Sequence, residues 1–224
     1  MISQNLNKVK ASLHEGVCLV AVSKFHPVES LQEAYDAGQR VFGESHMQEL
    51  MVKYEALPKD IEWHFIGHLQ TNKVKYIAPF ISLIHAVDTV KLLNEIDRQA
   101  QKVGRVIDCL LQMHIAQEET KYGFTPDELT EMLEAGEWKS LTNVRITGLM
   151  CMATNTDDET QIHKEFRYAH ETFEAVKQRF FADAPYFKEL SMGMSGDYMI
   201  AQEEHSTMVR VGSMIFGARN YSMN

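Results

Sequence analysis

The chain has 224 residues, of which 45% are hydrophobic and 24% are charged, and its formal net charge at pH 7 is −9. This composition is that of a globular protein, and the length permits one large domain, because single cores grow to roughly 250 residues before chains divide. The acidic balance disfavours general nucleic-acid binding, which requires a cluster of basic residues, and the sequence contains no such cluster.

Short apolar runs alternate along the chain with longer amphipathic segments, a pattern that indicates repeated β-strand and α-helix units. Eight of the runs are predicted to be strands, at residues 18–24, 40–44, 63–67, 83–88, 108–115, 146–153, 187–192 and 208–217.

The segments between these strands carry helix signals. Residues 31–37 are predicted to be helical and to end at Gly38, and a second helix is predicted between Thr125 and Gly136. Thr125 offers an N-cap, followed by a proline at the first helical position and a glutamate suited to a capping box. A third helix opens at residues 156–159, and its apolar stripe is Ile162, Phe166, Ala169, Phe173 and Val176.

No linker, charge block or internal repeat divides the chain, so we expect a single domain over residues 1–224. Eight strands that alternate with helices in this length predict an α/β fold, a single (β/α)8 TIM barrel. A doubly wound open sheet is the alternative. It requires a glycine-rich turn after the first strand, where this chain has residues Ser23-Lys24-Phe25-His26-Pro27.

The first predicted strand leads to a lysine. Its alternation places Val20, Val22 and Lys24 on one face. If that face points into the barrel, Lys24 lies at the mouth, where partial desolvation lowers the pKa of its amine and favours the neutral nucleophile of Schiff-base chemistry. From this feature alone, a solvated lysine that caps a strand is the more common interpretation.

Small and hydroxyl-bearing residues follow the seventh predicted strand, over 191–197, and precede a helical segment expected over 198–204. Converging backbone N–H groups there, together with the hydroxyl of Ser191 or Ser195, are suited to a phosphate. A plain turn from strand to helix is the simpler alternative.

The eighth predicted strand places Arg210 on one face with Met208 and Gly212, and the glycine permits close approach of the backbone. A nucleophilic lysine that faces a phosphate site is the arrangement required by a phosphorylated aldehyde cofactor. Pyridoxal 5′-phosphate is such a cofactor, so we expect it here.

Several short motifs, spread in order over nearly the whole chain, strengthen this expectation. They are residues 20–24, 42–44, 64–67, 69–70, 72–73, 148–150, 190–195, 208–212 and 216–219. From about residue 17 onward the chain resembles the pyridoxal phosphate homeostasis protein family. The resemblance implies a barrel of fold type III, like the N-terminal domain of alanine racemase, and a carrier or regulator rather than a known catalyst.

The resemblance also implies roles for individual residues. Lys24 is expected to form the imine with the cofactor and Arg210 to face its pyridine nitrogen. A guanidinium cannot protonate that nitrogen, so carbanion chemistry is disfavoured. The phosphate site that the resemblance implies consists of Ser195 with the backbone around Gly193, Met194, Gly212 and Ser213, and the pattern after the seventh strand offers Ser191 as a further hydroxyl. The family usually has asparagine after Phe-Gly-Glu, whereas this chain has Ser45, which leaves the polar contacts on that side open.

Three functions compete. The first is a pyridoxal phosphate carrier that exchanges its cofactor by transimination, without substrate turnover. The second is an amino-acid racemase or decarboxylase in pared-down form, with its cofactor open to solvent, which would turn over an amino acid at a rate well above that of free cofactor. The third is a cofactor-free aldolase that uses Lys24 on a sugar phosphate, and its lysine would be trapped only when substrate is added.

For the carrier we expect a monomer that binds pyridoxal phosphate and small amines or amino acids, with pyridoxal phosphate-dependent apoenzymes as candidate recipients. No apolar stretch approaches the ~20 residues of a membrane span, and the N-terminal residues lack the pattern of a signal peptide, so we expect a cytoplasmic protein without membrane or nucleic-acid partners.

Metal binding and disulfide bonding are not expected. His64 and His68 lie in a strand and the turn after it, where they do not share a helix face as a metal pair would. Cys18, Cys109 and Cys151 lie in apolar runs and are expected to be buried, reduced thiols. The tail over residues 220–224 is expected either to fold over the phosphate or to fray.

Overall fold

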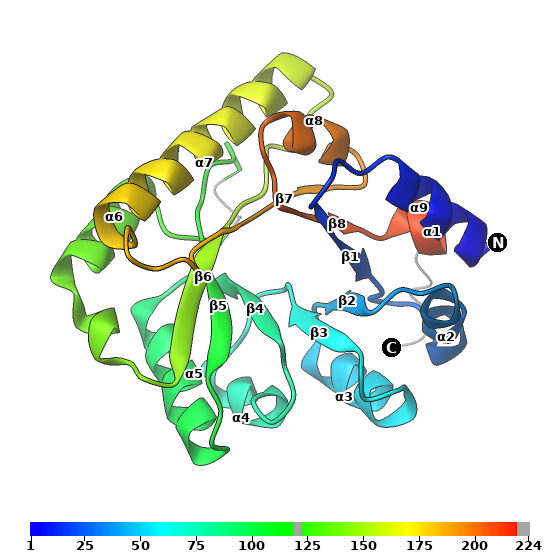
Figure 1. Cartoon of the computed structure of the whole chain (residues 1–224), viewed down its shortest axis with the longest axis horizontal. Coiled ribbons are helices and arrows are strands. Elements are labelled where there is room, and N and C mark those ends of the chain that lie inside the picture. Colours follow the sequence, from blue (N-terminus) through cyan, green and yellow to red (C-terminus); the bar gives the residue numbers. More distant parts are fainter. Residues whose placement is uncertain (119–121, 219–224) are drawn as a thin grey trace.

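A closed parallel barrel forms the centre of the molecule (Figure 1). The computed structural model describes residues 1–118 and 122–218. Within them eight strands pair in chain order and β8 closes onto β1. Their bounds are β1 Cys18–Val22, β2 Val41–Glu44, β3 Glu62–Phe65, β4 Leu83–Val87, β5 Ile107–Gln112, β6 Val144–Met150, β7 Glu189–Met194 and β8 Met208–Val211. The predicted TIM barrel is confirmed, and the open sheet is wrong.

Helices surround this ring of strands (Figure 1). Within the described part of the chain they are α1 Ile2–Ala11, α2 Val28–Asp36, α3 Met47–Ala56, α4 Val74–Ile77, α5 Val90–Lys102, α6 Pro126–Ala135, α7 Glu159–Phe180, α8 Tyr198–Glu203 and α9 Ser213–Phe216, with 3-10 turns η1 Thr71–Lys73 and η2 Glu137–Ser140. No helix among the described residues is long and apolar enough to cross a membrane.

The local helix signals act as predicted. Thr125 accepts a hydrogen bond from the backbone of Glu128, whose side chain accepts one in return, which completes the capping box of α6. Gly136 ends α6 with φ 71°, a backbone conformation that suits glycine. The five stripe residues of α7 are all buried, although the N-cap of that helix is Asp158. α2 begins at Val28, three residues before the predicted start.

The eighth predicted strand, residues 208–217, extends six residues (217 − 211) beyond the end of β8. β8 ends at Val211, and Ser213–Phe216 form α9. The backbone N–H groups of Ile215 and Phe216 both donate to the carbonyl of Gly212 at 2.9 Å. The pairing between β1 and β8 ends at Ala21 and Val211, so the chain beyond satisfies its backbone groups in local helical hydrogen bonds instead of a ladder.

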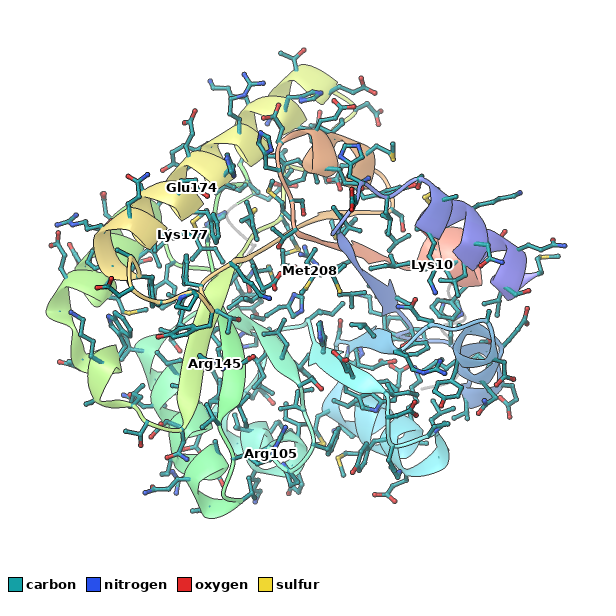
Figure 2. All side chains as sticks on the ribbon, viewed as in Figure 1. Lys10, Arg105, Arg145, Glu174, Lys177 and Met208 are labelled. Carbon is teal, nitrogen blue, oxygen red and sulfur yellow. The ribbon has the colours of Figure 1, made fainter. Side chains whose placement is uncertain are left out.

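Two buried layers make up the core. The larger lies between the strands and the helices, and a smaller cluster fills the barrel interior. The interior cluster is Val20, Leu83, Ala86, Leu110, Met150 and Met208. Figure 2 shows Met208 in the middle of the ring of strands. Val20 therefore points inward, as the predicted face of the first strand required.

The three cysteines are free thiols. Cys109 and Cys151 are buried as predicted, whereas Cys18 is only half-buried, because it begins β1 at the rim of the barrel.

Candidate functional site

A cavity of about 240 Å³ opens at the carboxyl ends of the barrel strands. That end of a TIM barrel carries the active site in essentially all enzymes of this architecture, because the loops after the strands converge there. The residues that line the cavity are Val22, Lys24, His26, Ser45, Ile66, Met152, Met194, Ser195, Gly196, Arg210, Gly212 and Ser213.

Lys24 reaches this cavity from the end of β1. The strand ends at Val22, and the backbone N–H of Ser23 still donates to the carbonyl of Gly43 at 3.0 Å, which extends the pairing by one residue. Phe25 then adopts φ 65°, so the chain turns sharply toward α2 directly after the lysine. The inward face of β1 and this turn together bring Lys24 to the mouth of the barrel.

Arg210 forms part of the cavity floor and is only 4% exposed. Its Nη1 donates to Ser191 Oγ at 2.6 Å and its Nη2 to the carbonyl of Cys151 at 3.0 Å. Burial lowers the pKa of the guanidinium from its ordinary value, yet arginine stays protonated in proteins. The site therefore contains a desolvated positive charge of fixed orientation.

Two buried histidines continue this network across the barrel interior. Arg210 can only donate, so Ser191 Oγ accepts from it, and Ser191 Oγ shares a second hydrogen bond with His85 Nδ1, 2.9 Å away. His85 Nε2 shares a further hydrogen bond with His64 Nδ1 at 3.0 Å. Burial lowers the pKa of His64 to about 3 and that of His85 well below its ordinary value. Both rings are therefore neutral, and hydrogen bonds link them through Ser191 to the guanidinium.

Small residues directly after β7 and β8 line another part of the cavity, namely Ser195, Gly196, Gly212 and Ser213. The backbone N–H of Gly212 donates to Ser195 Oγ at 3.2 Å, which links the two loops. Asp197 Oδ1 accepts from the backbone N–H of Met194 at 2.6 Å and holds the first loop in place. A Cβ at position 212 would lie 2.9 Å from the carbonyl oxygen of Val22, so only glycine permits this close approach of β8 to β1. Hydroxyls and backbone donors on small residues suit an anion.

The structure brings together six of the eight residues expected at the site: Lys24, Met194, Ser195, Arg210, Gly212 and Ser213 all line the cavity. Ser191 lies beneath the cavity, where it holds Arg210. Gly193 does not line it either. It has φ 97°, and a Cβ there would lie 2.6 Å from Ala201 Cβ, so its role is to let β7 pack against α8.

Sequence reasoning missed several lining residues, namely Val22, His26, Ile66, Met152 and Gly196. Four of these five residues are apolar or, in the case of Gly196, lack a side chain, so their residue types do not indicate a binding role. His26 stacks on Phe216 at a ring distance of 5.1 Å, and its position two residues after Lys24 was the only clue. His85 was also missed, although a polar residue within the apolar run 83–87 marks the inner face of β4.

Two further expectations concern the C-terminal tail and metal binding. The motif residue Arg219 and the tail over residues 220–224 lie outside the described residues. Among residues 1–118 and 122–218, no three His, Cys, Asp or Glu side chains are grouped as metal ligands.

The chain matches known families over nearly its whole length. The family model of the alanine racemase N-terminal domain matches residues 1–220. A pyridoxal phosphate homeostasis protein of Aquifex aeolicus is 40% identical over 204 residues, which cover 91% of this chain and 87% of that protein. One of Pasteurella multocida is 36% identical over 234 residues and 99% of each chain.

Solved structures agree with this assignment. PipY of Synechococcus elongatus with pyridoxal phosphate bound has a TM-score of 0.85 and 35% identity, over 97% of this chain and 100% of that one. The alanine racemase of Clostridium difficile has a TM-score of 0.74 at 14% identity, over 99% of this chain and 56% of that one, which shows the shared fold alone. The chain belongs to the alanine racemase N-terminal domain family and, within it, to the pyridoxal phosphate homeostasis proteins.

Proposed function

We propose that this protein binds pyridoxal 5′-phosphate as a Schiff base on Lys24 and exchanges it with small amines as part of intracellular pyridoxal phosphate homeostasis. The observation that carries the proposal is one cavity that holds a lysine, a buried guanidinium and a cradle of small, hydroxyl-bearing residues. The names of the relatives and the pyridoxal phosphate bound to PipY support the same ligand.

The residues present fit this cofactor. When bound, pyridoxal phosphate supplies an aldehyde that condenses with an amine. Lys24 provides that amine at the cavity mouth. Ser195 and Ser213 provide hydroxyls to the phosphate, and Gly212 keeps β8 close to β1 so that its backbone borders the cavity. Met194, 38% exposed, provides an apolar wall.

Arg210 supports binding and exchange without catalysis of a further reaction. Its guanidinium is held by Ser191 and by the Cys151 carbonyl, so it presents a fixed positive charge at the floor of the cavity. With pyridoxal phosphate bound, a guanidinium opposite the pyridine nitrogen would not give up a proton, so the ring would be a weaker electron sink than with a carboxylate partner. We therefore expect no racemisation or decarboxylation above the rate of free cofactor.

The rest of the proposal concerns the setting of the protein. We infer a cytoplasmic, single-domain monomer that exchanges pyridoxal phosphate with amino acids or other small amines and passes it to pyridoxal phosphate-dependent apoenzymes. Size-exclusion chromatography with light scattering checks the monomer, and activation of a pyridoxal phosphate-dependent apoenzyme by the loaded protein checks the transfer.

The decisive experiment is the visible absorption spectrum before and after borohydride reduction, followed by peptide mass mapping. We expect a yellow imine band that borohydride removes, with the reduced cofactor on the peptide that contains Lys24. Lys24→Ala should lose the band, whereas Lys102→Ala, at the exposed end of α5, should keep it. A colourless protein that takes up no added pyridoxal phosphate, or reduced cofactor on another lysine, overturns the proposal.

The cofactor-free aldolase is distinguished in the same experiment. It predicts a protein in which borohydride traps Lys24 only after a sugar phosphate has been added.

A further inference from the structure

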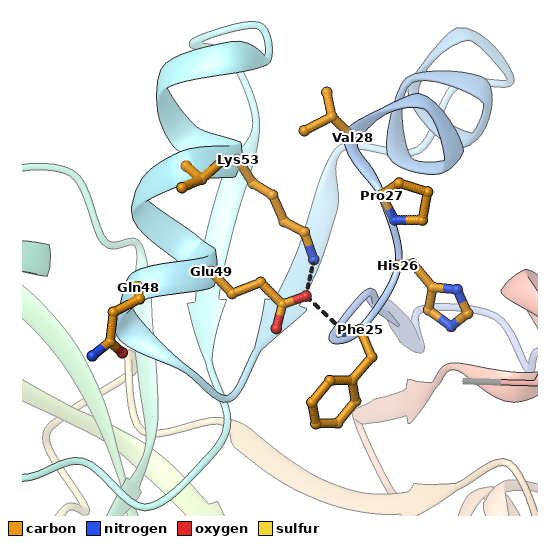
Figure 3. A pocket seen from close by; sticks show the side chains of 8 residues that line it. Phe25, His26, Pro27, Val28, Gln48, Glu49 and Lys53 are labelled. Carbon is orange, nitrogen blue, oxygen red and sulfur yellow. Dashed lines mark hydrogen bonds and ion pairs between the residues drawn. The ribbon is translucent and has the colours of Figure 1, made fainter. Parts of the chain in front are cut away.

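A buried ion cluster lies directly behind the loop that carries Lys24. It consists of Glu44 at the end of β2 together with Glu49 and Lys53 of α3. Lys53 Nζ lies 2.6 Å from Glu44 Oε1 and 2.6 Å from Glu49 Oε1, and Lys53 is only 3% exposed. The cluster borders a second cavity, of about 310 Å³, on the outer side of that loop (Figure 3).

Each member of this cluster binds a residue adjacent to Lys24. On one side, Ser23 donates from Oγ to Glu44 Oε1 at 2.6 Å, and its carbonyl accepts from Lys53 Nζ at 2.7 Å. On the other side, the backbone N–H of Phe25 donates to Glu49 Oε1 at 2.6 Å. Figure 3 shows Lys53 and Glu49 directed toward each other and Glu49 directed toward the backbone of Phe25. The two neighbours of the lysine are thus held by one network.

The backbone at Phe25 needs such support. Its φ of 65° lies in the left-handed region, which is costly for a bulky residue and persists only where surrounding contacts determine it. A hydrogen bond to a charged carboxylate is stronger than one between neutral groups, so Glu49 is suited to hold this turn. The conformation of this turn therefore determines the direction of the Lys24 side chain.

Stability alone does not account for the cluster. Burial of the Glu44 carboxylate and the Lys53 ammonium, beside the half-buried Glu49, carries a desolvation penalty that their attraction does not reliably offset. Glu44 is fully buried, its Oε2 has no hydrogen-bond partner among the described residues, and burial raises the pKa of its carboxyl to about 7 despite the nearby Lys53. A cluster that costs free energy and touches both neighbours of Lys24 fits a role in the function of that lysine.

We propose that Glu49, held by Lys53, which in turn binds Glu44, is a positioning residue that fixes the backbone around Lys24 and so orients its amine for Schiff-base formation. The inference rests on the proposed function of Lys24. The ion cluster contacts the loop after β1, whereas Ser195 and Gly212 directly follow β7 and β8. The orientation of the Lys24 amine and the binding of the cofactor can therefore be altered separately.

The test compares two ligands on Glu49→Ala. The first is pyridoxal phosphate, for which the growth rate of the imine band is measured. The second is pyridoxine 5′-phosphate, which has no aldehyde and reports binding alone by calorimetry. We expect imine formation to slow by about tenfold or more, since small displacements of a reacting group have effects of this size, and the affinity for pyridoxine phosphate to stay unchanged.

Two control variants complete the test. Glu49→Gln keeps an oxygen that accepts from Phe25 and should form the imine within about threefold of the wild-type rate, because that hydrogen bond survives. Glu55→Ala removes an exposed glutamate of the same helix and should match the wild type.

A wild-type rate in Glu49→Ala overturns the inference, and so does an equal loss of pyridoxine phosphate binding, which would indicate general loosening. Amide hydrogen exchange of the wild-type protein gives a second check that needs no variant. The Phe25 N–H should be protected, and exchange as fast as that of an open loop contradicts the inference. Failure of the proposed function looks different, since the wild-type protein would then form no imine at all.

Discussion

Replacement of His64 with asparagine should make the protein less sensitive to mild acid. His64 is only 4% exposed inside the barrel, and its Nδ1 shares a hydrogen bond with His85 Nε2. An asparagine side chain places an amide oxygen close to that Nδ1, so the hydrogen bond can be kept while the titratable ring is lost.

The size of the effect follows from the pKa. Burial lowers the pKa of His64 from 6.5 to about 3 in the folded protein, so the unfolded state binds the proton first as the pH falls. The stabilisation is therefore present above pH 6.5 and is lost as the pH falls toward 3. Between pH 7 and pH 5 the unfolded chain gains most of one proton, which lowers the free energy of unfolding by about 2 kcal/mol per buried neutral histidine.

His85 contributes with the same sign as His64, but Glu44 contributes with the opposite sign. The pKa of Glu44 is raised to about 7 by burial, so the stability that it contributes is lost as the pH rises and regained as it falls. The acid response of the wild-type protein thus contains opposed contributions. For this reason the prediction concerns the difference between His64→Asn and the wild type, which leaves Glu44 and His85 common to both.

The assay is chemical denaturation, followed by circular dichroism, of both proteins at pH 7 and pH 5. Over this interval the free energy of unfolding of the wild type should fall by about 2 kcal/mol more than that of His64→Asn, whatever the stability of the variant at pH 7. His14→Asn, at an exposed histidine, should respond to pH as the wild type does. The reasoning is refuted by equal losses in His64→Asn and the wild type, or by an NMR titration in which the His64 ring takes up a proton between pH 7 and pH 5.

Three further predictions concern the thiols, the cradle and the ion cluster. Burial raises the pKa of Cys151 to about 12 and that of Cys18 to about 11, so iodoacetamide at pH 8 should leave both largely unmodified in the native protein and modify both after unfolding, as measured by mass spectrometry. Gly212→Ala places a Cβ 2.9 Å from the carbonyl oxygen of Val22, so calorimetry should show about tenfold weaker binding of pyridoxal phosphate or more, and an unchanged affinity would contradict the cradle. Glu44→Gln removes a carboxyl whose folded pKa is raised. From pH 5 to pH 8, the free energy of unfolding of the variant should therefore rise by up to about 3 kcal/mol relative to that of the wild type, as measured by chemical denaturation. A difference that stays constant with pH would count against the raised pKa.

Local patterns in the sequence were sufficient to predict the barrel and the strand face that Lys24 shares. The alternation along the first strand placed Val20 on the same face as Lys24, and Val20 lies in the barrel interior. The same alternation predicted that Arg210 shares a strand face with Met208, and both are buried. Such predictions succeed because the period of a strand or helix depends only on the residues within it.

Interactions across the barrel were beyond the reach of the sequence. His85 and Ser191 are 106 residues apart, and Lys53 meets the carbonyl of Ser23 from 30 residues away. Nothing in the local sequence marks these pairs as partners, because they meet only when the sheet closes and α3 packs behind β1 and β2. The role of Ser191 changed for this reason, from a phosphate ligand to the support of Arg210.

The ends of the strands show the same division. The sequence determined by itself which runs are strands, since apolar residues at the right period specify them. Where a strand ends depends on the length of its neighbour, so only the closed barrel decided that Ser213–Phe216 form a helix rather than the end of β8. The sequence likewise determined that a lysine, an arginine and small hydroxyl-bearing residues follow the strands, whereas the tertiary structure decided which of them share one cavity and which buried charges hold them there. The physical reason is that periodicity is a local property, whereas desolvation and hydrogen-bond pairing arise only when distant strands come together.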